Sequence, residues 1–302
     1  MPPDEPADGP SVAGLPRHPA LRPGLHVVRR DDRHLQVGVD PPAVLVVPDD
    51  PETRRVLEDL RTGARPATSS PSARRLVADL LARGLVVDAA ARDDDLRAAS
   101  DRAAVAAAYA QFGDDARRRL TARAEARVLV EAPTDLGHAA RLLRASGVAL
   151  AARPDEATAA LVISEEVLPR ERLDPLLRVG LPHLVVAPGP GGLTVGPFVA
   201  PGLTACLRCV DARLAERDPR RPMLLEQCRP ATLASGPVPR DPALFSIAVA
   251  LAARDVVSFV DGDEPTTWSA TVTVGTELSL ARRGWRRHPH CGCAWDDALA
   301  AV

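Results

Sequence analysis

Two short cysteine motifs that lie far apart along the chain constrain its fold more than any other feature. Cys206 and Cys209 lie in TACLRCV, and Cys291 and Cys293 lie in HPHCGC near the end of the sequence. A Cys-X-X-Cys turn entering a helix and a Cys-Gly-Cys turn can each turn two thiolates toward one ion, and four thiolates complete the tetrahedral coordination of zinc. We therefore expect a structural zinc site that ties the tail of the chain to a helix over 207–217.

Other arrangements of these residues remain open. The four cysteines could be buried free thiols or could form disulfides, although disulfides are disfavoured in a cytosolic protein. His288 and His290 could replace a cysteine as ligands, but we expect them beside the site rather than on the metal. Cys228 stands alone, and we expect a buried structural thiol rather than a nucleophile.

Composition predicts a globular protein with a sizeable core. The chain has 302 residues, 46% of them hydrophobic, and a formal net charge of −2. We find no secretion signal and no run of 18 apolar residues, so we expect a cytoplasmic protein without a membrane span. The sequence contains no lysine and no asparagine, so no lysine can hold a nucleotide phosphate or form a Schiff base.

The N-terminal part predicts a small α+β domain after a disordered arm. Residues 1–23 are rich in proline and lack a hydrophobic period, which is typical of disorder. Between 24 and 90, three apolar runs precede two amphipathic helices, the second over 72–83, and a short strand over 85–87 follows. Gly84 stands where the glycine after a helix C-terminus belongs. This order predicts a winged-helix domain.

The rest of the chain predicts helices over 91–126 and an α/β domain over 127–302. In that domain, buried-strand patterns alternate with helical patterns, which favours a Rossmann-like, mostly parallel sheet closed by the zinc clip. An alternating strand at 268–274 is expected to pair antiparallel with 276–281. The expected strands are 127–131, 160–164 and 183–187, and the expected helices are 136–147, 170–178, 207–217 and 242–260.

The first strand of this domain lacks a glycine loop for phosphate. A G-x-G-x-x-G loop would occupy 132–137, but here Ala132 and Thr134 replace the two glycines that let a backbone approach a pyrophosphate, and only Gly137 remains. Asp135 would add a negative charge near the phosphate. We expect no nucleotide site here. The glycine-rich segment 187–197 is expected to be a hairpin turn, and Glu165 and Glu166, after a strand, have no assigned role.

Together, the stretch VGPFVAPGLTACLRCVDARLAERDPRRP and the tail HPHCGC resemble the ThiF/MoeB-type family related to ubiquitin-activating enzymes. The likeness runs from about 125 to 293 and is closest to the cyclodehydratase-like (ocin-ThiF-like) branch of azole-peptide, or bacteriocin, biosynthesis. The order of elements over 24–90 resembles the PqqD-like peptide-recognition domain that such proteins carry.

The resemblance implies a Rossmann-like fold that is often dimeric, with zinc on Cys206, Cys209, Cys291 and Cys293. Active family members adenylate a carboxyl terminus with ATP, using the glycine loop, an arginine, an asparagine, a lysine and an aspartate. This sequence lacks the first two loop glycines and has no lysine or asparagine. In the cyclodehydratase branch, the corresponding protein has lost that chemistry and presents a leader peptide to a separate YcaO-type enzyme.

Our leading hypothesis is a non-catalytic scaffold in which the winged domain takes up an extended peptide as an added strand. The candidate pocket residues are Val44, Val46, Leu76 and Leu80, although each could simply be core. A divergent ATP-dependent adenylyltransferase is the alternative. A DNA-binding winged helix is less favoured, because residues 51–90 contain seven arginines against five acidic residues, a small basic excess.

Overall fold

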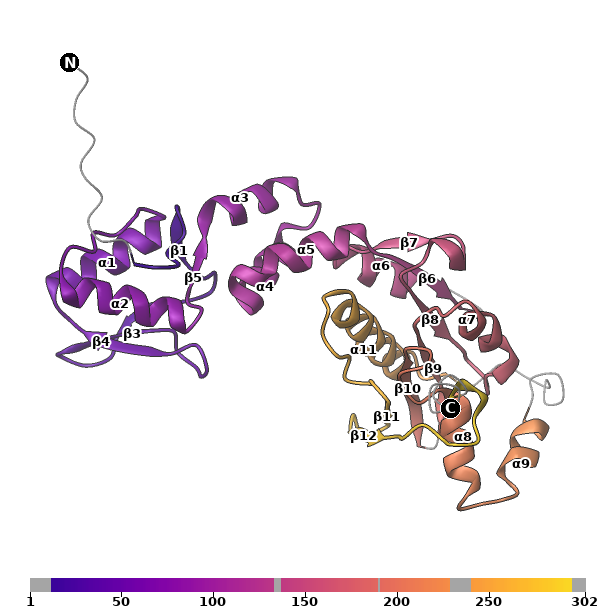
Figure 1. Cartoon of the computed structure of the whole chain (residues 1–302). Helices are drawn as coiled ribbons and strands as arrows, with labels where there is room; N and C mark the ends of the chain where they lie inside the picture. The colour runs from indigo at the N-terminus through magenta and orange to yellow at the C-terminus, as the bar shows by residue number, and fades with distance from the viewer. Residues whose placement is uncertain (1–11, 133–136, 190, 229–239, 295–302) are drawn as a thin grey trace, which may run out of the picture. The chain divides into compact units, whose positions relative to one another are not determined.

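The computed structural model describes residues 12–132, 137–189, 191–228 and 240–294 of the chain (Figure 1). It divides into two compact units, Met1–Leu120 and Thr121–Val302. Each unit has its own sheet and its own hydrophobic cluster.

The first unit is built on a three-stranded antiparallel sheet of β2 (Val27–Arg29), β3 (His34–Val37) and β4 (Leu45–Pro48). Helices α1 (Pro51–Thr62) and α2 (Pro71–Ala82) follow, each with proline in its first turn. The side chains of Asp50 and Ser70 accept backbone N–H groups at the two helix starts, which satisfies donors that have no partner within the helix. Gly84 has a φ of +63° after α2, as the sequence predicted. The core of this unit lies among these elements: Val37, Leu45, Val47, Val56, Leu57, Leu60, Val77 and Leu80.

The strand expected as a wing pairs elsewhere. Strand β5 (Val86–Asp88) is antiparallel to β1 (Pro19–Leu21) and does not join the three-stranded sheet. All three residues of β1 are buried, so the prediction of a disordered arm is wrong for this segment. Residues 1–11 of the expected arm lie outside the described residues. A three-residue strand gives no alternating pattern from which its partner can be read.

The segment expected to be helical is helical. Helices α3 (Ala89–Ala98), α4 (Arg102–Phe112) and α5 (Ala116–Glu125) follow one another, with the 3₁₀ turn η1 (Gly113–Asp115) before α5. Tyr109 of α4 is buried, and its hydroxyl donates to the carboxylate of Asp95 at 2.7 Å. Burial raises the pKa of Tyr109 above its usual range, and the hydrogen bond with Asp95 adds to that shift.

The second unit is built on a seven-stranded mixed sheet with the order β12-β11-β10-β9-β8-β6-β7. Strand β6 pairs in parallel with β7 and β8, and β8 pairs in parallel with β9. The other three pairs, from β9 to β12, are antiparallel. The prediction of a mostly parallel sheet is therefore wrong, because half of the strand pairs are antiparallel. The strands are β6 (Arg127–Glu131), β7 (Ala149–Ala151), β8 (Ala159–Ile163), β9 (His183–Gly189), β10 (Gly192–Val199), β11 (Ala270–Gly275) and β12 (Leu280–Gly284).

The glycine-rich segment forms the expected hairpin between β9 and β10, in which Gly189 pairs with Gly192. Gly192 lies so close to β11 that a Cβ atom there would stand 2.0 Å from the carbonyl oxygen of Val274. Only glycine fits at that position. Strand β12 begins later than the predicted 276–281, because residues 276–279 form the turn that joins it to β11.

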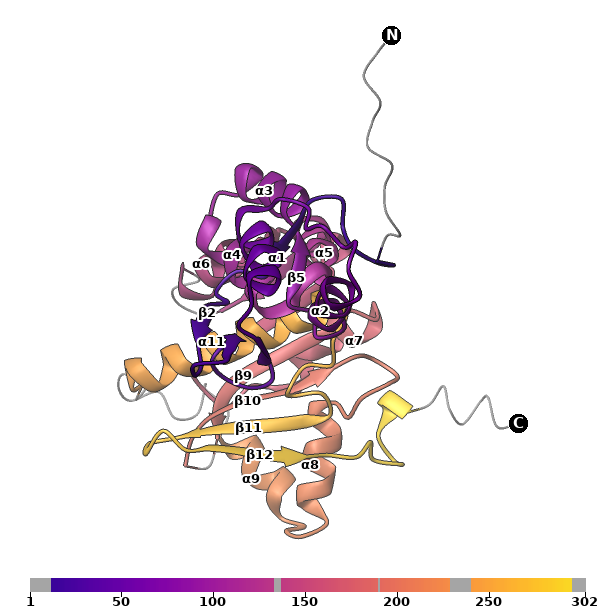
Figure 2. The same cartoon turned by 90° about the vertical axis from the view of Figure 1, so that its left-hand side faces the viewer.

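Helices cover both faces of the larger sheet (Figure 2). Helices α6 (Gly137–Ala145) and α11 (Pro242–Val260) share one hydrophobic cluster with β6, β8, β9 and β10, and α11 has the bounds that the sequence predicted. On the other face, Leu173 and Leu176 pack against Val162 and Val185. The remaining elements are η2 (Pro154–Glu156), η3 (Arg170–Leu173), α7 (Asp174–Arg178), α8 (Leu207–Ala215), α9 (Arg221–Gln227) and η4 (Gly292–Ala294).

Helix α11 also has the length and the apolar composition that a membrane-crossing helix needs. The same properties belong to a core helix, and seven of its apolar residues are buried in the cluster that it shares with the sheet. These buried residues are Leu244, Ala248, Val249, Ala252, Ala253, Val256 and Val257.

Two buried carboxylates fix the C-terminal part of α11. Asp255 accepts hydrogen bonds from the backbone N–H groups of Thr266 and Thr267 at 3.0 and 2.8 Å, and from the Thr267 hydroxyl at 2.6 Å. Asp261, just after the helix, forms a bidentate ion pair with Arg123, with both N–O distances 2.6 Å. Both partners are almost fully buried, so this pair joins α5 to α11 inside the unit.

Candidate metal centre

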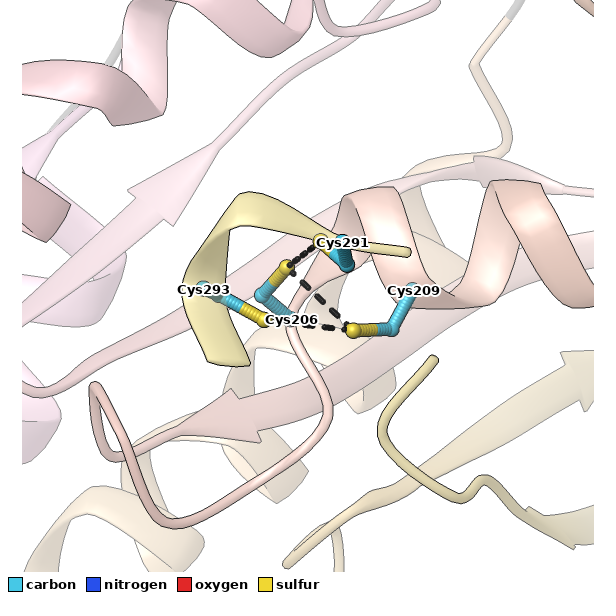
Figure 3. A group of neighbouring side chains, drawn as sticks. All are labelled: Cys206, Cys209, Cys291 and Cys293. Carbon is cyan, nitrogen blue, oxygen red and sulfur yellow. Dashed lines mark hydrogen bonds between the residues drawn. The ribbon is translucent and has the colours of Figure 1, made fainter. Parts of the chain in front are cut away.

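The four predicted cysteine ligands lie together in the second unit (Figure 3). The Sγ atoms of Cys206 and Cys209 are 3.7 Å apart, those of Cys206 and Cys291 3.6 Å, and those of Cys209 and Cys293 3.3 Å. All four sulfurs lie within 4.8 Å of one another. In a tetrahedral zinc site with bonds of about 2.3 Å, neighbouring sulfurs are about 3.8 Å apart. The cluster therefore has the donor set and the spacing of a structural metal site such as a zinc site.

The local folding of each motif explains why its two sulfurs face the same point. Cys206 is the residue that caps α8 and Cys209 lies in the first turn of that helix, so their side chains share one side of it. The backbone N–H groups of a helix N-terminus favour negative charge, which suits thiolates. Cys291 precedes the short turn η4 and Cys293 lies within it, so the second pair approaches from the tail of the chain.

Hydrogen bonds hold the segments around the cysteines in place. The hydroxyl of Thr204 donates to the carbonyl of Phe198 and accepts the N–H of Ala200, which fixes the turn between β10 and α8. The N–H of Ala205 donates to the Ser269 hydroxyl at 3.0 Å, which links Cys206 to the start of β11. These bonds position the segment that leads into Cys206 and Cys209.

The electrostatics of the cluster favour a cation. The hydrogen bond between Cys206 and Cys209 raises the pKa of the Cys206 thiol and lowers the pKa of the Cys209 thiol. The backbone N–H of His288 also donates to the Cys209 sulfur at 3.3 Å. A buried cluster cannot hold four thiolates without a balancing positive charge, and a divalent cation supplies one.

The other residues considered for this site lie beside the cluster or away from it. The ring of His288 contacts Glu216, with Nε2 3.2 Å from Oε1, and His290 is exposed, so neither histidine belongs to the group of four candidate ligands. The expectation that Cys228 is buried is wrong, because it is exposed at the end of α9. Sequence reasoning missed the backbone N–H of His288, since spacing alone does not show which main-chain groups reach a sulfur.

The edge where a nucleotide phosphate would lie carries carboxylates. Ala132 follows β6 and is half-buried, Gly137 begins α6, and Thr134 lies outside the described residues. Glu165, just after β8, pairs with Arg240 at 2.5 Å beside a cavity of about 150 Å³. Glu131, the last residue of β6, lies 3.8 Å from Arg172. Arg240 and Arg172 thus each form an ion pair with a carboxylate at the carboxyl ends of the parallel strands.

The four candidate peptide contacts differ in their exposure to solvent. Leu76 and Leu80 are buried in the core of the first unit. Val46 is 41% exposed and points away from that core, as alternation along β4 requires, because Leu45 and Val47 point into it. Val44 is half-buried, and its carbonyl accepts a hydrogen bond from Arg83.

Strand β4 nevertheless offers a free edge, because it pairs with β3 on one side and ends the described three-stranded sheet on the other. The N–H of Asp49 donates to the carbonyl of Arg33, which makes that pair a hydrogen-bonded one. Since hydrogen-bonded pairs alternate along an antiparallel ladder, Val47 also faces β3 and Val46 directs its N–H and C=O outward.

No model of a protein family matches the sequence, and no curated protein matches it significantly. Among solved structures, the heterocyclase TruD is similar to this chain, with 18% sequence identity and a TM-score of 0.69 over 92% of this chain. A heterocyclase in complex with substrate and cofactor is 15% identical, with a TM-score of 0.66 over 91% of this chain. The chain spans 42% and 39% of the lengths of these two proteins.

E. coli MccB is also similar, with 13% identity and a TM-score of 0.59 over 91% of this chain and 96% of MccB. Another structure of MccB contains N-formylated MccA, and its TM-score is 0.62. At such identities the likeness establishes a shared fold. It supports the predicted ThiF-like resemblance at the level of the fold, while the likeness of residues 24–90 to a PqqD-like domain stays a prediction.

Proposed function

We propose that this chain is a non-catalytic, zinc-stabilised scaffold that binds a leader peptide and presents it to a partner enzyme. The observation that carries the proposal is the edge described above: a fold shared with heterocyclases has carboxylates where a nucleotide phosphate would lie. Glu131 and Glu165 lie at the ends of adjacent parallel strands, and each already pairs with an arginine that could otherwise bind a phosphate.

In this proposal, the leader peptide adds to the free edge of β4 as a further strand. The outward N–H and C=O of Val46 pair with the backbone of the peptide, and the exposed Val46 side chain contacts an apolar residue of it. Leu76 and Leu80 contribute indirectly, because they support the sheet from its buried face. Affinity thus comes from the main chain and register from the side chains.

The resemblance extends the proposal to a cytoplasmic homodimer that works with a YcaO-type enzyme. The solved structures of the similar heterocyclase with substrate and of MccB with N-formylated MccA support a role in binding a modification substrate. Cys206, Cys209, Cys291 and Cys293 would hold zinc, which has a structural role because four protein ligands leave no open position on a tetrahedral ion.

Calorimetric titration with the leader segments of short peptides encoded beside the gene tests the proposal. We expect micromolar binding of one of them, and we expect Val46→Pro to weaken it about tenfold or more, because proline removes an outward N–H and leaves the bonds to β3 intact. Arg29→Pro is the matched control: the N–H of Arg29 points outward at the opposite edge of the same sheet, so binding should not change.

The adenylyltransferase alternative is tested in the same instrument with ATP and Mg²⁺. We expect no binding heat and no pyrophosphate release with or without peptide. Peptide-stimulated pyrophosphate release would contradict the proposal and favour the enzyme. Binding of a DNA duplex in place of any peptide would favour the winged-helix alternative.

A further inference from the structure

We propose that the outer edge of β12 is a docking site for an acidic, extended segment of a partner protein, which joins the larger sheet as an additional strand. This site lies in the second unit and is independent of the peptide proposed for β4. It is carried by the backbone, the charge and the exposed apolar residues of Leu280–Gly284 and the residues around them.

Strand β12 is the last strand of the described larger sheet, as Figure 2 shows, and β11 is its one described neighbour. The N–H of Gly275 donates to the carbonyl of Ser279 at 2.9 Å, and the N–H of Trp285 donates to the carbonyl of Ser269 at 2.7 Å. These bonds identify the residues of β12 that face β11. By alternation, the residues between them direct their N–H and C=O outward: Leu280, Arg282 and Gly284.

The edge is strongly basic. Residues 277–290 contain four arginines and one glutamate. Arg282 and Arg283 alternate along the strand and so lie on opposite faces of the sheet. Arg282 donates from Nε to the carbonyl of Thr266 at 2.8 Å, and the Arg283 guanidinium lies 4.1 Å from the ring centre of Trp285. No carboxylate among the described residues pairs with either arginine, so an added strand can place an acidic side chain opposite each.

Protection against aggregation does not account for this edge by itself. Charged side chains on an edge strand commonly serve that purpose. Here, however, Leu278 is 63% exposed and Leu280 is 59% exposed, although leucines at an edge promote the association that the charges would prevent. The edge therefore has the parts of a selective site: free backbone groups, apolar contacts and positive charge.

The same features select the kind of occupant. A second copy of β12 would bring arginines against arginines, which is unfavourable. A nucleic acid would use the arginines but neither the outward backbone groups nor the leucines. An extended polypeptide with acidic residues among apolar ones uses all three.

Fluorescence anisotropy with labelled eight-residue peptides in which pairs of Glu alternate with pairs of Val, so that Glu lies on both faces of the strand, tests the inference. We expect binding in the range of about 10–500 μM, and about tenfold weaker binding when every Glu is replaced by Gln. The double variant Arg282→Glu/Arg283→Glu should lose binding. Its matched control, Arg141→Glu/Arg144→Glu, makes the same charge change on two exposed residues of α6 and should bind as the wild type does.

A second probe separates strand addition from simple charge attraction. Two further peptides carry N-methyl groups on one or the other set of alternating residues, which keeps every charge and removes half of the backbone donors. At least one of them should bind about tenfold more weakly. Equal binding of all three peptides would overturn the inference.

Three other results would also overturn it: no binding of the Glu peptide, tighter binding of an oligonucleotide of equal charge, or a dimer that dissociates when Arg282 and Arg283 are replaced. Circular dichroism of the double variant guards against loss of the fold, because a folded variant that still binds the Glu peptide counts against the inference as well.

Discussion

Removal of the metal should destabilise the second unit far more than the loss of any single contact. Structural zinc contributes about 10–16 kcal/mol of binding free energy in small zinc-binding peptides at a 1 M reference. At about 10 μM free zinc, roughly 7 kcal/mol of this is subtracted, which leaves about 3–9 kcal/mol of stabilisation. The sulfurs already lie 3.3–3.7 Å apart, close to tetrahedral spacing, so little rearrangement opposes binding.

For a unit of this size, each kcal/mol shifts Tm by about 2–4 °C, so a strong chelator should lower Tm by roughly 6–36 °C. Thermal unfolding followed by circular dichroism, with metal content from elemental analysis, measures both quantities. Cys206→Ser should reproduce the effect of the chelator, whereas Cys228→Ser, at an exposed thiol outside the cluster, should not. A chelator shift below about 2 °C would refute the reasoning, and so would equimolar metal in Cys206→Ser.

Three further predictions concern buried polar groups in the second unit. Asp255→Ala should cost about 3–6 kcal/mol in urea unfolding, because three donors to a buried carboxylate lose their acceptor; a cost below about 1 kcal/mol would contradict this. Asp261→Asn should cost about 3–5 kcal/mol, because it leaves Arg123 buried without its charge partner, and replacing both residues by apolar ones should cost less. Burial lowers the pKa of His183 in the folded protein below its value in the unfolded chain, which is about 6.5. The protein should therefore be fully stable above about pH 6.5 and lose stability as the pH falls below that value, because the unfolded chain then binds a proton that the buried ring resists. Unfolding at pH 7.5 and 5.5 should show this loss in the wild type and a smaller one in His183→Phe.

The clustering of the four cysteines was predictable from the sequence because its signal is chemical rather than positional. Thiols in two tight pairs are rare in a chain with five cysteines, and their convergence is the arrangement that gives a divalent ion four ligands. Helix α11 was equally clear, since Asp241 and Pro242 mark its start and its apolar length marks its extent. The signal for the helix lies within one segment, and each cysteine pair lies within its own short motif.

The errors concern which strands pair with each other, because pairing depends on residues in other parts of the chain. Strand β5 has three residues and pairs with β1, a strand hidden in a proline-rich stretch, so neither the wing nor the full disordered arm was correct. Strand β10 was taken for part of a turn because glycines interrupt its apolar pattern, although Gly192 is required by its close approach to β11. The antiparallel pairs of β10 with β9 and β11 were missed for that reason, whereas the antiparallel pairing of β11 with β12 was expected.

The exposure of the candidate peptide-site residues could be predicted only in part. Apolar residues on β4 and α2 look alike in sequence, but a strand has two faces, and one residue in two points away from the core. Leu80 lies in the core and Val46 lies outside it, so of these two residues Val46 is the one that can contact a peptide directly. The free edge of β4 could not be seen from the sequence either, because it depends on which strand ends the sheet.

The cysteine cluster and the proposed docking edge are directly connected along the chain. Trp285 follows β12 directly, donates from Nε1 to the Thr271 hydroxyl at 2.9 Å, and packs against the cysteine cluster. Cys291 lies only seven residues beyond the end of β12, so a metal bound there restrains the far end of the strand. Strand addition costs least when the edge is already ordered before its partner arrives. A metal bound by the cysteines would not contact the docked segment, yet it would influence how tightly the edge binds that segment.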